Sequence, residues 1–213
     1  MKAILIYSGG MDSTTLLHEY KDSIQLAVTF GYGAKHNARE IDCAVENCHR
    51  LGIRHLLIPL DFIGKYFRSS LLIGGGDIPE GNYSDENMHT TVVPFRNGIM
   101  LAVAAGLAES LGLDTVLIAN HSGDHAIYPD CRPEFIEAFG NATKAGTYNG
   151  VDIVSPYCHL TKRDIALRGR ALGVDYSLTY SCYKGGEKHC GRCGTCTERK
   201  EALEGFDPTE YEA

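Results

Sequence analysis

The stretch that most constrains the fold is residues 3–17, which read AILIYSGGMDSTTLL. Its first five residues are an apolar run with strand character, and residues 13–20 carry apolar side chains at helical spacing. Between them lies a polar turn in which Gly9 and Gly10 permit positive φ angles and close approach of a ligand. Such a turn into a helix is a ready anion site, because the first helical N–H groups lack intrahelical partners and the dipole is positive there.

Polar side chains around the turn extend this prediction. Ser8 and Ser13 add hydroxyl donors, and Asp12 can cap the helix or face a magnesium ion beside bound phosphates. The turn is neither a Walker loop nor a GxGxxG dinucleotide turn. SGGMDS after an N-terminal strand instead resembles the pyrophosphate loop of the N-type ATP pyrophosphatases, which transfer AMP to a substrate oxygen. The simpler alternative is an ordinary glycine turn with a capping Asp.

Length and composition suit one globular domain spanning residues 1–213. The chain is 44% hydrophobic and 22% charged, and we expect no membrane-spanning segment because no stretch approaches about 18 uninterrupted apolar residues. The N-terminus reads directly into structure without a cleavage site, which favours a cytoplasmic location. A net charge of −7 argues against a nucleic-acid-binding surface, which usually shows as a basic patch.

The order of apolar and helical stretches predicts an α/β fold. Residues 23–30 and 54–60 read as strands, and the helix between them at 37–51 ends at Gly52. The first sixty residues thus run β-α-β-α-β, which predicts parallel strands and a Rossmann-like sheet of about five strands with helices on both faces. Later elements are predicted in this order: helix 98–111, strand 114–120, helix 133–143, strand 151–155 and helix 161–172.

Residues 61–91 are the least periodic part of the chain. They include three consecutive glycines at 74–76, and we expect a long surface loop with one short helix near 63–72. Long loops in compact domains are often lids or disordered segments, and a lid over the nucleotide is one interpretation.

Two cations stand at predicted helix starts, where they oppose the helix dipole. Arg96 precedes the helix at 98–111, and Lys162 lies in the first turn of the helix that Thr161 caps with Asp164. Their positions suggest contact with a phosphate or substrate, although simple surface cations are the alternative.

A dense polar patch at residues 121–132 follows the predicted strand 114–120. It is typical of a substrate pocket, and its His and Asp residues are more often hydrogen-bonding groups than metal ligands. The helix after it starts with Pro133 at a favoured first position.

Four of the eight cysteines cluster near the C-terminus, at Cys182, Cys190, Cys193 and Cys196. In a reducing compartment this clustering favours a metal over disulfides. Four thiolates fit a structural Zn²⁺, which we favour over an iron–sulfur cluster because nothing here calls for redox chemistry. Residues 179–199 are therefore predicted to form a zinc-binding segment that loses order without the metal.

Together, four motifs identify a narrower family. SGGMDS, VPFRN, YPDCRPEF and SCYKGGEKHCGRCGTCTER resemble the 7-cyano-7-deazaguanine (preQ0) synthase family, over nearly the whole chain from residue 3 to 208. Residues 61–91 match no motif of that family. The resemblance implies ATP, with Mg²⁺, and 7-carboxy-7-deazaguanine and ammonia as reactants, Zn²⁺ as a structural ion, and a homodimer. It also implies two adenylations, of the acid and then of the amide, to give the nitrile of queuosine and archaeosine precursor synthesis.

Candidate site residues follow from the resemblance for the ATP loop, and from position at a helix start or in the polar patch for Arg96, Lys162 and the substrate-binding residues. FGYG after the second strand resembles the turn that holds adenosine. The predicted ATP-binding residues are Ser8, Gly9, Gly10, Met11, Asp12, Ser13, Thr14, Thr15, Leu16, Leu17, His18, Phe30 and Gly31. The predicted catalytic residues are Asp12, Ser13, Arg96 and Lys162. The predicted substrate-binding residues are Asp124, Tyr128, Asp130 and Arg132, where either acid reads the base and Arg132 pairs with the carboxylate.

Other functions remain open at this stage. A paralogue on the same fold could adenylate a tRNA base or a protein, although the charge of −7 disfavours a tRNA substrate. A zinc-stabilised nucleotide sensor of the universal-stress type is a non-enzymatic alternative that the polar patch disfavours. The chain has little room for a glutaminase domain, which favours free ammonia as the nitrogen source.

Overall fold

The computed structural model describes residues 1–82 and 86–212. In these residues five parallel strands form one sheet in the order β3-β2-β1-β4-β5. The strands are β1 (Ala3–Ile6), β2 (Ile24–Gly31), β3 (His55–Pro59), β4 (Thr115–Leu117) and β5 (Asp152–Val154). The predicted Rossmann-like sheet of about five strands is therefore confirmed.

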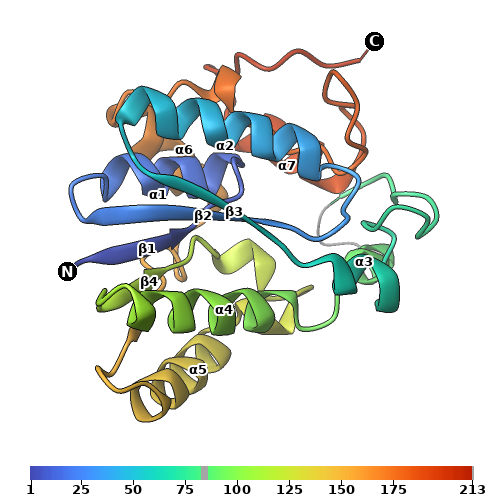
Figure 1. Cartoon of the computed structure of the whole chain (residues 1–213). Coiled ribbons are helices and arrows are strands. Elements are labelled where there is room, and N and C mark those ends of the chain that lie inside the picture. Colours follow the sequence, from blue (N-terminus) through green and yellow to red (C-terminus); the bar gives the residue numbers. More distant parts are fainter. Residues whose placement is uncertain (83–85, 213) are drawn as a thin grey trace.

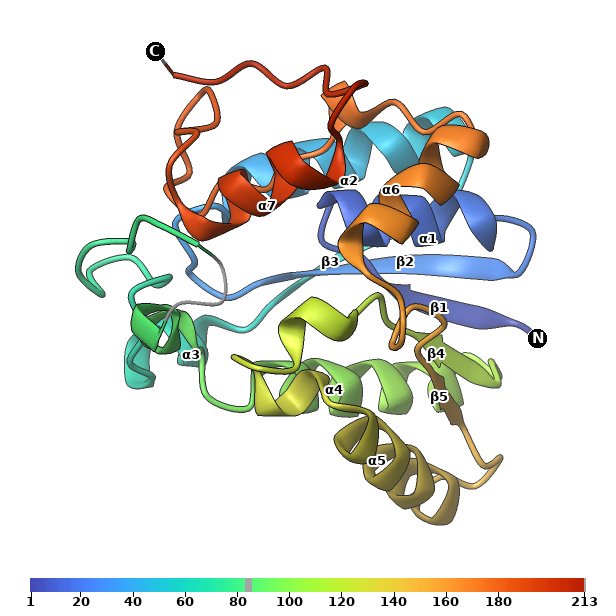
Figure 2. The ribbon, with the colours of Figure 1, turned by 180° about the vertical axis from the view of Figure 1, so that it is seen from behind.

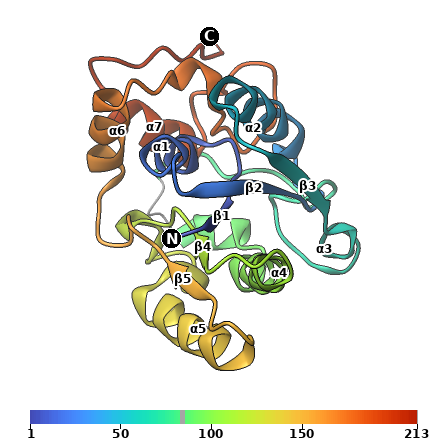
Figure 3. The same cartoon turned by 60° about the vertical axis from the view of Figure 1, so that its left-hand side comes forward.

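Helices cover both faces of the sheet, as the alternation of strands and helices predicts (Figures 1 and 3). One face carries α1 (Met11–Glu19), α2 (Asn37–Leu51), α6 (Lys162–Ala171) and α7 (Gly194–Ala202). The other carries α4 (Arg96–Ser110) and α5 (Pro133–Gly146). Figure 2 shows α7 and the chain leading to it on the side of α1, α2 and α6.

The alternation of side chains along β1 explains the two layers. Ile4 points into the cluster that contains Leu101 of α4, whereas Leu5 packs in the cluster with Leu16 of α1 and Ala44 of α2. Because successive strand residues face opposite sides, a short continuous apolar run such as AILI fills both cores at once.

The strand order places the ligand site. The chain turns from β1 outward to β2 and β3 and then crosses back to β4, so the order reverses beside β1. In open α/β sheets ligands bind beyond the carboxyl ends of the strands at such a reversal. The residues that follow β1 and β4 are the glycine turn and the polar patch, which this topology brings to one edge.

The described residues of the stretch 61–91 form more regular structure than the predicted surface loop. The short helix is α3 (Asp61–Tyr66), a few residues earlier than predicted, and a 3₁₀ turn, η1 (Glu86–Thr91), precedes α4. The backbone N–H of Ser70 donates to Thr90 O at 2.9 Å, and Leu71 and Leu72 lie in the core. These tertiary contacts draw residues 69–72 away from helical pairing. The lid interpretation stays a prediction, and residues 83–85 lie outside the described residues.

One stretch, Met88–Ser110, is long and apolar enough to cross a membrane by length and composition, and half of its most apolar window is buried. The stretch is η1 followed by α4, and Phe95 between them has φ of 53°. Helix α4 alone has 15 residues, about 22 Å at 1.5 Å per residue, which is shorter than a bilayer core. Its apolar side chains are those of a core helix that packs against β1 and β4.

Candidate active site

A cleft opens at the carboxyl edge of the sheet, between the glycine turn, the start of α4 and the C-terminal segment. It encloses about 1100 Å³ including its mouth. Polar residues from distant parts of the sequence line it, among them Ser8, Asp12, Ser13, Tyr32, His36, Glu40, Arg96, Asn97, Asn120, Asp124, Tyr128, Lys162, Ser181 and Tyr183. The sheet contributes an apolar floor that includes Ile6, Phe30 and Ile118.

The glycine turn forms the open start of α1. Gly9 has φ of 93°, and a Cβ there would lie 2.1 Å from Glu40 O, so only glycine fits. Gly10 is the N-cap residue of α1, and no side chain caps the helix. The Ser8 hydroxyl accepts the Gly10 N–H at 3.0 Å and lies 3.1 Å from the Ser13 hydroxyl. The first N–H groups of α1 thus face the cleft between two hydroxyls.

The remaining predicted ATP-binding residues lie behind this turn or beside it. Thr14 and Thr15 are buried and bond to the hydroxyls of Tyr7 and Tyr176 at 3.1 and 2.9 Å. Phe30 lines the cleft, whereas Gly31 is the last residue of β2 and accepts the Leu60 N–H. The buried Met11, Leu16 and Leu17 and the half-exposed His18 do not line the cleft. Their direct contact with ATP stays a prediction.

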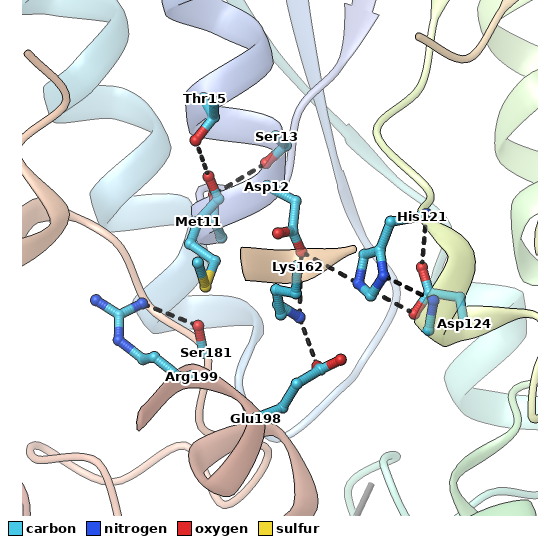
Figure 4. Close-up of polar contacts among 12 residues, drawn as sticks. Met11, Asp12, Ser13, Thr15, His121, Asp124, Lys162, Ser181, Glu198 and Arg199 are labelled. Carbon is cyan, nitrogen blue, oxygen red and sulfur yellow. Dashed lines mark hydrogen bonds and ion pairs between the residues drawn. The ribbon is translucent and has the colours of Figure 1, made fainter. Parts of the chain in front are cut away.

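A charged cluster lies beside the turn (Figure 4). Lys162 Nζ is 3.2 Å from Asp12 Oδ2 and 2.7 Å from Glu198 Oε2, and its side chain is only 11% exposed. Burial alone would lower the pKa of Lys162, but the carboxylates of Asp12, Glu198 and Asp124 raise it, so the ammonium form persists. Burial raises the pKa of Glu198, whereas Lys162 opposes that rise. The lysine predicted from its helix start therefore points at the loop.

Two buried polar atoms in this cluster have no hydrogen-bond partner among the described residues, Asp12 Oδ1 and His121 Nε2. His121 Nδ1 accepts the Gly123 N–H at 3.1 Å, so a neutral ring carries its proton on Nε2. Nε2 lies 3.8 Å from Asp12 Oδ2 and 3.7 Å from Asp124 Oδ1, and both distances are too long for a hydrogen bond. Both orphaned atoms can receive a ligand, a cation at the carboxylate or an acceptor at the imidazole.

The opposite end of the cleft is aromatic and carries one guanidinium. Arg96 donates to Tyr32 Oη at 3.1 Å, and Tyr32 and Tyr183 both contact the His36 ring. Burial would lower the pKa of Arg96, but the tyrosine hydroxyls and Asp130 raise it, so Arg96 stays charged. Burial and then Arg96 lower the pKa of His36 to about 3, so this imidazole is neutral.

Arg96 is presented by a strained turn. Phe95, at the N-cap of α4, has φ of 53°, in the left-handed region that bulky residues rarely adopt. A Cβ at Gly98 would lie 2.4 Å from the Phe95 ring, so the glycine makes room for this arrangement. Such strain persists where the surrounding structure fixes it and is common at ligand sites.

The structure separates the four predicted substrate-binding residues. Asp124 and Tyr128 line the cleft. The buried Asp130 accepts the Asn97 N–H at 2.8 Å, and Arg132 donates to His125 O at 2.9 Å, and neither lines the cleft. Their contacts with substrate stay predictions.

The four clustered cysteines converge, as predicted. Their Sγ atoms are buried and all lie within 4.8 Å of one another, so they can hold a metal ion. Cys190 Sγ and Cys196 Sγ are 3.9 Å apart, close to the edge of about 3.8 Å for a tetrahedron with 2.3 Å zinc–sulfur bonds. Gly191, in the turn between Cys190 and Cys193, has φ of 72°, which favours glycine. The donor set and its spacing fit zinc.

Sequence analysis did not identify Glu198, which pairs with Lys162 beside the cleft, or the cleft residues His36, Glu40 and Tyr183. Glu198 meets a lysine 36 residues away in sequence, so no local pattern indicates it. His36 and Glu40 lie one helical turn apart at the start of α2, with 3.7 Å between Nε2 and Oε2. Their i, i+4 spacing next to the FGYG turn was the one available signal.

The chain is similar to one protein family over almost its whole length. A family model described as "Queuosine biosynthesis protein QueC" matches residues 2–207. A 7-cyano-7-deazaguanine synthase of Porphyromonas gingivalis is 63% identical, covering 99% of this chain and 97% of the relative. Those of Desulfotalea psychrophila and Methanoregula boonei are 54% and 48% identical, over 98% and 100% of this chain and the same shares of the relatives.

Among solved structures, NMN synthetase from Francisella tularensis has a TM-score of 0.51 at 14% identity, covering 87% of this chain and 68% of that chain. At that identity the likeness concerns the fold alone. The match of the family model over almost the whole sequence, together with these relatives, shows that the chain belongs to the QueC family of 7-cyano-7-deazaguanine synthases.

Proposed function

We propose that this chain makes 7-cyano-7-deazaguanine from 7-carboxy-7-deazaguanine and ammonia, with two molecules of ATP consumed as AMP and pyrophosphate. The observation that carries the proposal is the uncapped start of α1, which faces the cleft beside the buried Lys162. Full-length relatives bear the name of this activity, and the cleft supplies what an adenylating site needs.

The proposed reaction has two adenylations. In the first, a substrate carboxylate oxygen attacks the α-phosphorus of ATP and pyrophosphate leaves. Ammonia then attacks the acyl carbon, and the C–O bond to AMP breaks, so that AMP leaves with the bonding electron pair. Loss of one proton from nitrogen gives the amide. In the second, the amide oxygen attacks a second ATP and pyrophosphate leaves again. Cleavage of the C–O bond with departure of AMP, and loss of both N–H protons, give the nitrile.

The residues divide this work by position. The N–H groups at the start of α1 and the hydroxyls of Ser8 and Ser13 hold the departing pyrophosphate. Lys162 neutralises charge that develops there. At the other end, Arg96 is the cationic side chain best placed to hold the substrate carboxylate, since it lines the cleft and Arg132 does not. Positioning and electrostatic stabilisation supply most of the rate in such a site.

Two sets of side-chain atoms, a carboxylate oxygen and four thiolates, fit the metals of the proposal. Asp12 Oδ1 is buried without a partner, which suits Mg²⁺ held by one carboxylate and the ATP phosphates. When bound, Mg²⁺ would neutralise phosphate charge. Zn²⁺ on the four cysteines would be structural, because four thiolates leave no open position. We also propose free ammonia as the nitrogen source, a cytoplasmic location and a homodimer.

The second candidate is a paralogue that adenylates a tRNA base or a protein. Mass spectrometry separates the two after incubation of the protein with ATP, magnesium, ammonium and 7-carboxy-7-deazaguanine. A nitrile formed with two equivalents of AMP is expected. AMP formation only in the presence of tRNA or a protein acceptor would replace the proposal with the paralogue.

Arginine variants then test the substrate end of the cleft. Arg96→Ala should raise KM for the acid by about a hundredfold, the typical cost of a lost charge-assisted pair. Arg132→Ala should retain turnover if Arg96 holds the carboxylate. Loss of turnover in Arg132→Ala, with normal metal content and normal behaviour of Arg96→Ala, would return the role to Arg132.

A further inference from the structure

We infer that Glu198 is a positioning residue that couples the four-cysteine segment to the pyrophosphate loop through Lys162. The inference rests on the proposed function, in which Lys162 faces the phosphates. Glu198 lies two residues after Cys196 on α7, whereas Lys162 is the first residue of α6. Their contact thus joins the metal-binding end of the chain to the site of adenylation.

The contact geometry makes the lysine a shared ion. Nζ lies 2.7 Å from Glu198 Oε2 and 3.2 Å from Asp12 Oδ2, and the three side chains are 11%, 14% and 20% exposed (Figure 4). With Asp12 as its one partner, the ammonium would settle against that carboxylate and neutralise it. Glu198 draws the ammonium away from Asp12 and leaves Asp12 Oδ1 without a partner. Glu198 therefore keeps both the cation and the carboxylate oxygen available to a nucleotide.

The cysteine segment fixes where Glu198 stands. Cys193 is the N-cap residue of α7, and its carbonyl accepts the N–H groups of Cys196 and Thr197 at 2.9 and 3.0 Å. The first turn of α7 is therefore built on two members of the metal-binding group. A metal held by those thiolates would lock the rotation of α7 and with it the direction of Glu198.

A buried arginine next to Glu198 holds the same helix from its other side. Arg199 is completely buried and donates to Tyr176 O at 2.7 Å, to Thr179 Oγ1 at 2.9 Å and to Ser181 Oγ at 3.0 Å. The segment that Arg199 grips also reaches the loop directly, since the Tyr180 N–H donates to Gly9 O at 3.1 Å. The four-cysteine segment thus contacts the loop directly, by a backbone hydrogen bond to Gly9. It also contacts the loop indirectly, because Glu198 pairs with Lys162 and Lys162 pairs with Asp12.

Substitutions on α7 test the coupling with a matched control. Glu198→Gln removes the charge and keeps the shape, Glu198→Asp restores the charge on a shorter arm, and Glu201→Gln makes the same change at an exposed position of the same helix. For each variant, bound metal, the calorimetric Kd for MgATP, kcat and KM are measured. Glu198→Gln should keep its metal, weaken MgATP about 5-fold and lower kcat about 30-fold, since small misplacements of catalytic groups carry such costs.

The control and the rescue define the expected pattern. Glu198→Asp should recover part of kcat, and Glu201→Gln should match the unmodified chain. In a Lys162→Met background, Glu198→Gln should change neither Kd nor kcat further, because Glu198 acts through that lysine.

Three outcomes would overturn the coupling: Glu198→Gln behaving like Glu201→Gln, a full additional loss in the Lys162→Met background, or loss of activity only in step with loss of metal in both Glu198 variants. Failure of the proposed function looks different. The unmodified chain would then yield no nitrile, while the MgATP affinities of Glu198→Gln and Glu201→Gln would still differ and support the coupling.

Discussion

Helices α1 and α4 both begin at the cleft, on opposite faces of the sheet, but their N-termini are capped differently. At α4 the Asp130 side chain accepts the Asn97 N–H at 2.8 Å, so a buried group of the protein occupies the helix N-terminus. At α1 the N-cap is Gly10, and no side chain caps the helix. Both helices begin with N–H groups that lack intrahelical partners and with the positive end of the dipole, so the difference lies in what satisfies those groups.

This difference shows which of the two helix N-termini at the sheet edge is open to an anionic ligand. A carboxyl group bound at the start of α4 satisfies that helix within the chain and leaves no place for an anion. The start of α1 is left to an external anion. The carboxylate in its first turn, Asp12, is paired with Lys162, and a second carboxyl in the cleft, Glu40, is mostly uncharged. Burial raises the pKa of Glu40 to about 8, against smaller opposing effects of Arg96 and Ser8, so this neighbour does not repel phosphate at neutral pH.

Gly10→Asp tests this difference most directly, because it places a capping carboxylate at the N-cap of α1. Gly10 has φ of −76°, which any residue adopts, and an added Cβ would lie 3.1 Å from Ser8 Oγ. We expect MgATP affinity to fall at least about a hundredfold, roughly 2.7 kcal/mol, while stability holds or rises. Calorimetry gives the affinity, and Gly10→Asn separates charge from bulk. Unchanged binding by Gly10→Asp would place the phosphates elsewhere.

The reverse experiment opens the start of α4 with Asp130→Ala. The Asn97 N–H would lose its acceptor in a buried place, so the free energy of unfolding should fall by about 2 kcal/mol. Urea unfolding measures this loss, and Asp130→Asn, which keeps an acceptor oxygen, should lose less. Affinity for MgATP should change less than about threefold, because the open start is at α1. An Asp130→Ala variant of full stability would remove Asp130 as the cap.

Glu40 gives the contrast a dependence on pH. Its pKa is raised from 4.5 to about 8, so the folded chain keeps a proton that the unfolded chain releases, and stability falls as pH rises between these values. The pKa of His36 is lowered from 6.5 to about 3, so that imidazole is neutral in the folded chain over this range, and its own contribution to the pH dependence is common to the unmodified chain and a Glu40 variant. Between pH 6.5 and 7.5, Glu40 should remove up to about 1.4 kcal/mol.

Glu40→Gln isolates this contribution. Chemical unfolding of both proteins at pH 6.5 and 7.5 gives their free energies of unfolding. Between these pH values the unmodified chain should lose more unfolding free energy than the variant. Equal losses in the two proteins would mean that Glu40 is already ionised in the folded state.

The parts predicted correctly from sequence depend on local signals. Helix α2 spans the predicted residues and ends at Gly52, whose φ is 65°, because a glycine after the last turn takes the left-handed conformation cheaply. The Thr161–Asp164 capping box at α6 is present as predicted. The glycine turn and the cysteine cluster also lie within short windows, so residue type and spacing sufficed.

The parts that sequence analysis missed depend on pairs distant in the chain. The side chain of Asp130 accepts a hydrogen bond from Asn97 of another element, and a local pattern cannot show this bond; its predicted contact with substrate stays a prediction. Glu198 follows the cysteines within the predicted zinc-binding segment, and only the fold shows that it contacts Lys162. The helix predicted near 63–72 ends early because Ser69 and Ser70 bond to residues 90 and 91 instead. In each case a tertiary partner overrides local preference.

The start of α6 offers the smallest and most selective test. Thr161 Oγ1 accepts the Asp164 N–H at 3.2 Å and Asp164 Oδ2 accepts the Thr161 N–H at 3.0 Å, so this start is also closed by the chain. Thr161→Ala should lower the free energy of unfolding by about 1 kcal/mol, and Thr161→Ser should restore it. MgATP affinity should change less than about twofold, because Asp12 and Glu198 still hold Lys162. If Thr161→Ala instead lost MgATP as Gly10→Asp is expected to do, a closed helix start would be as important for the nucleotide as the open one, and the distinction between α1 and its neighbours would fail.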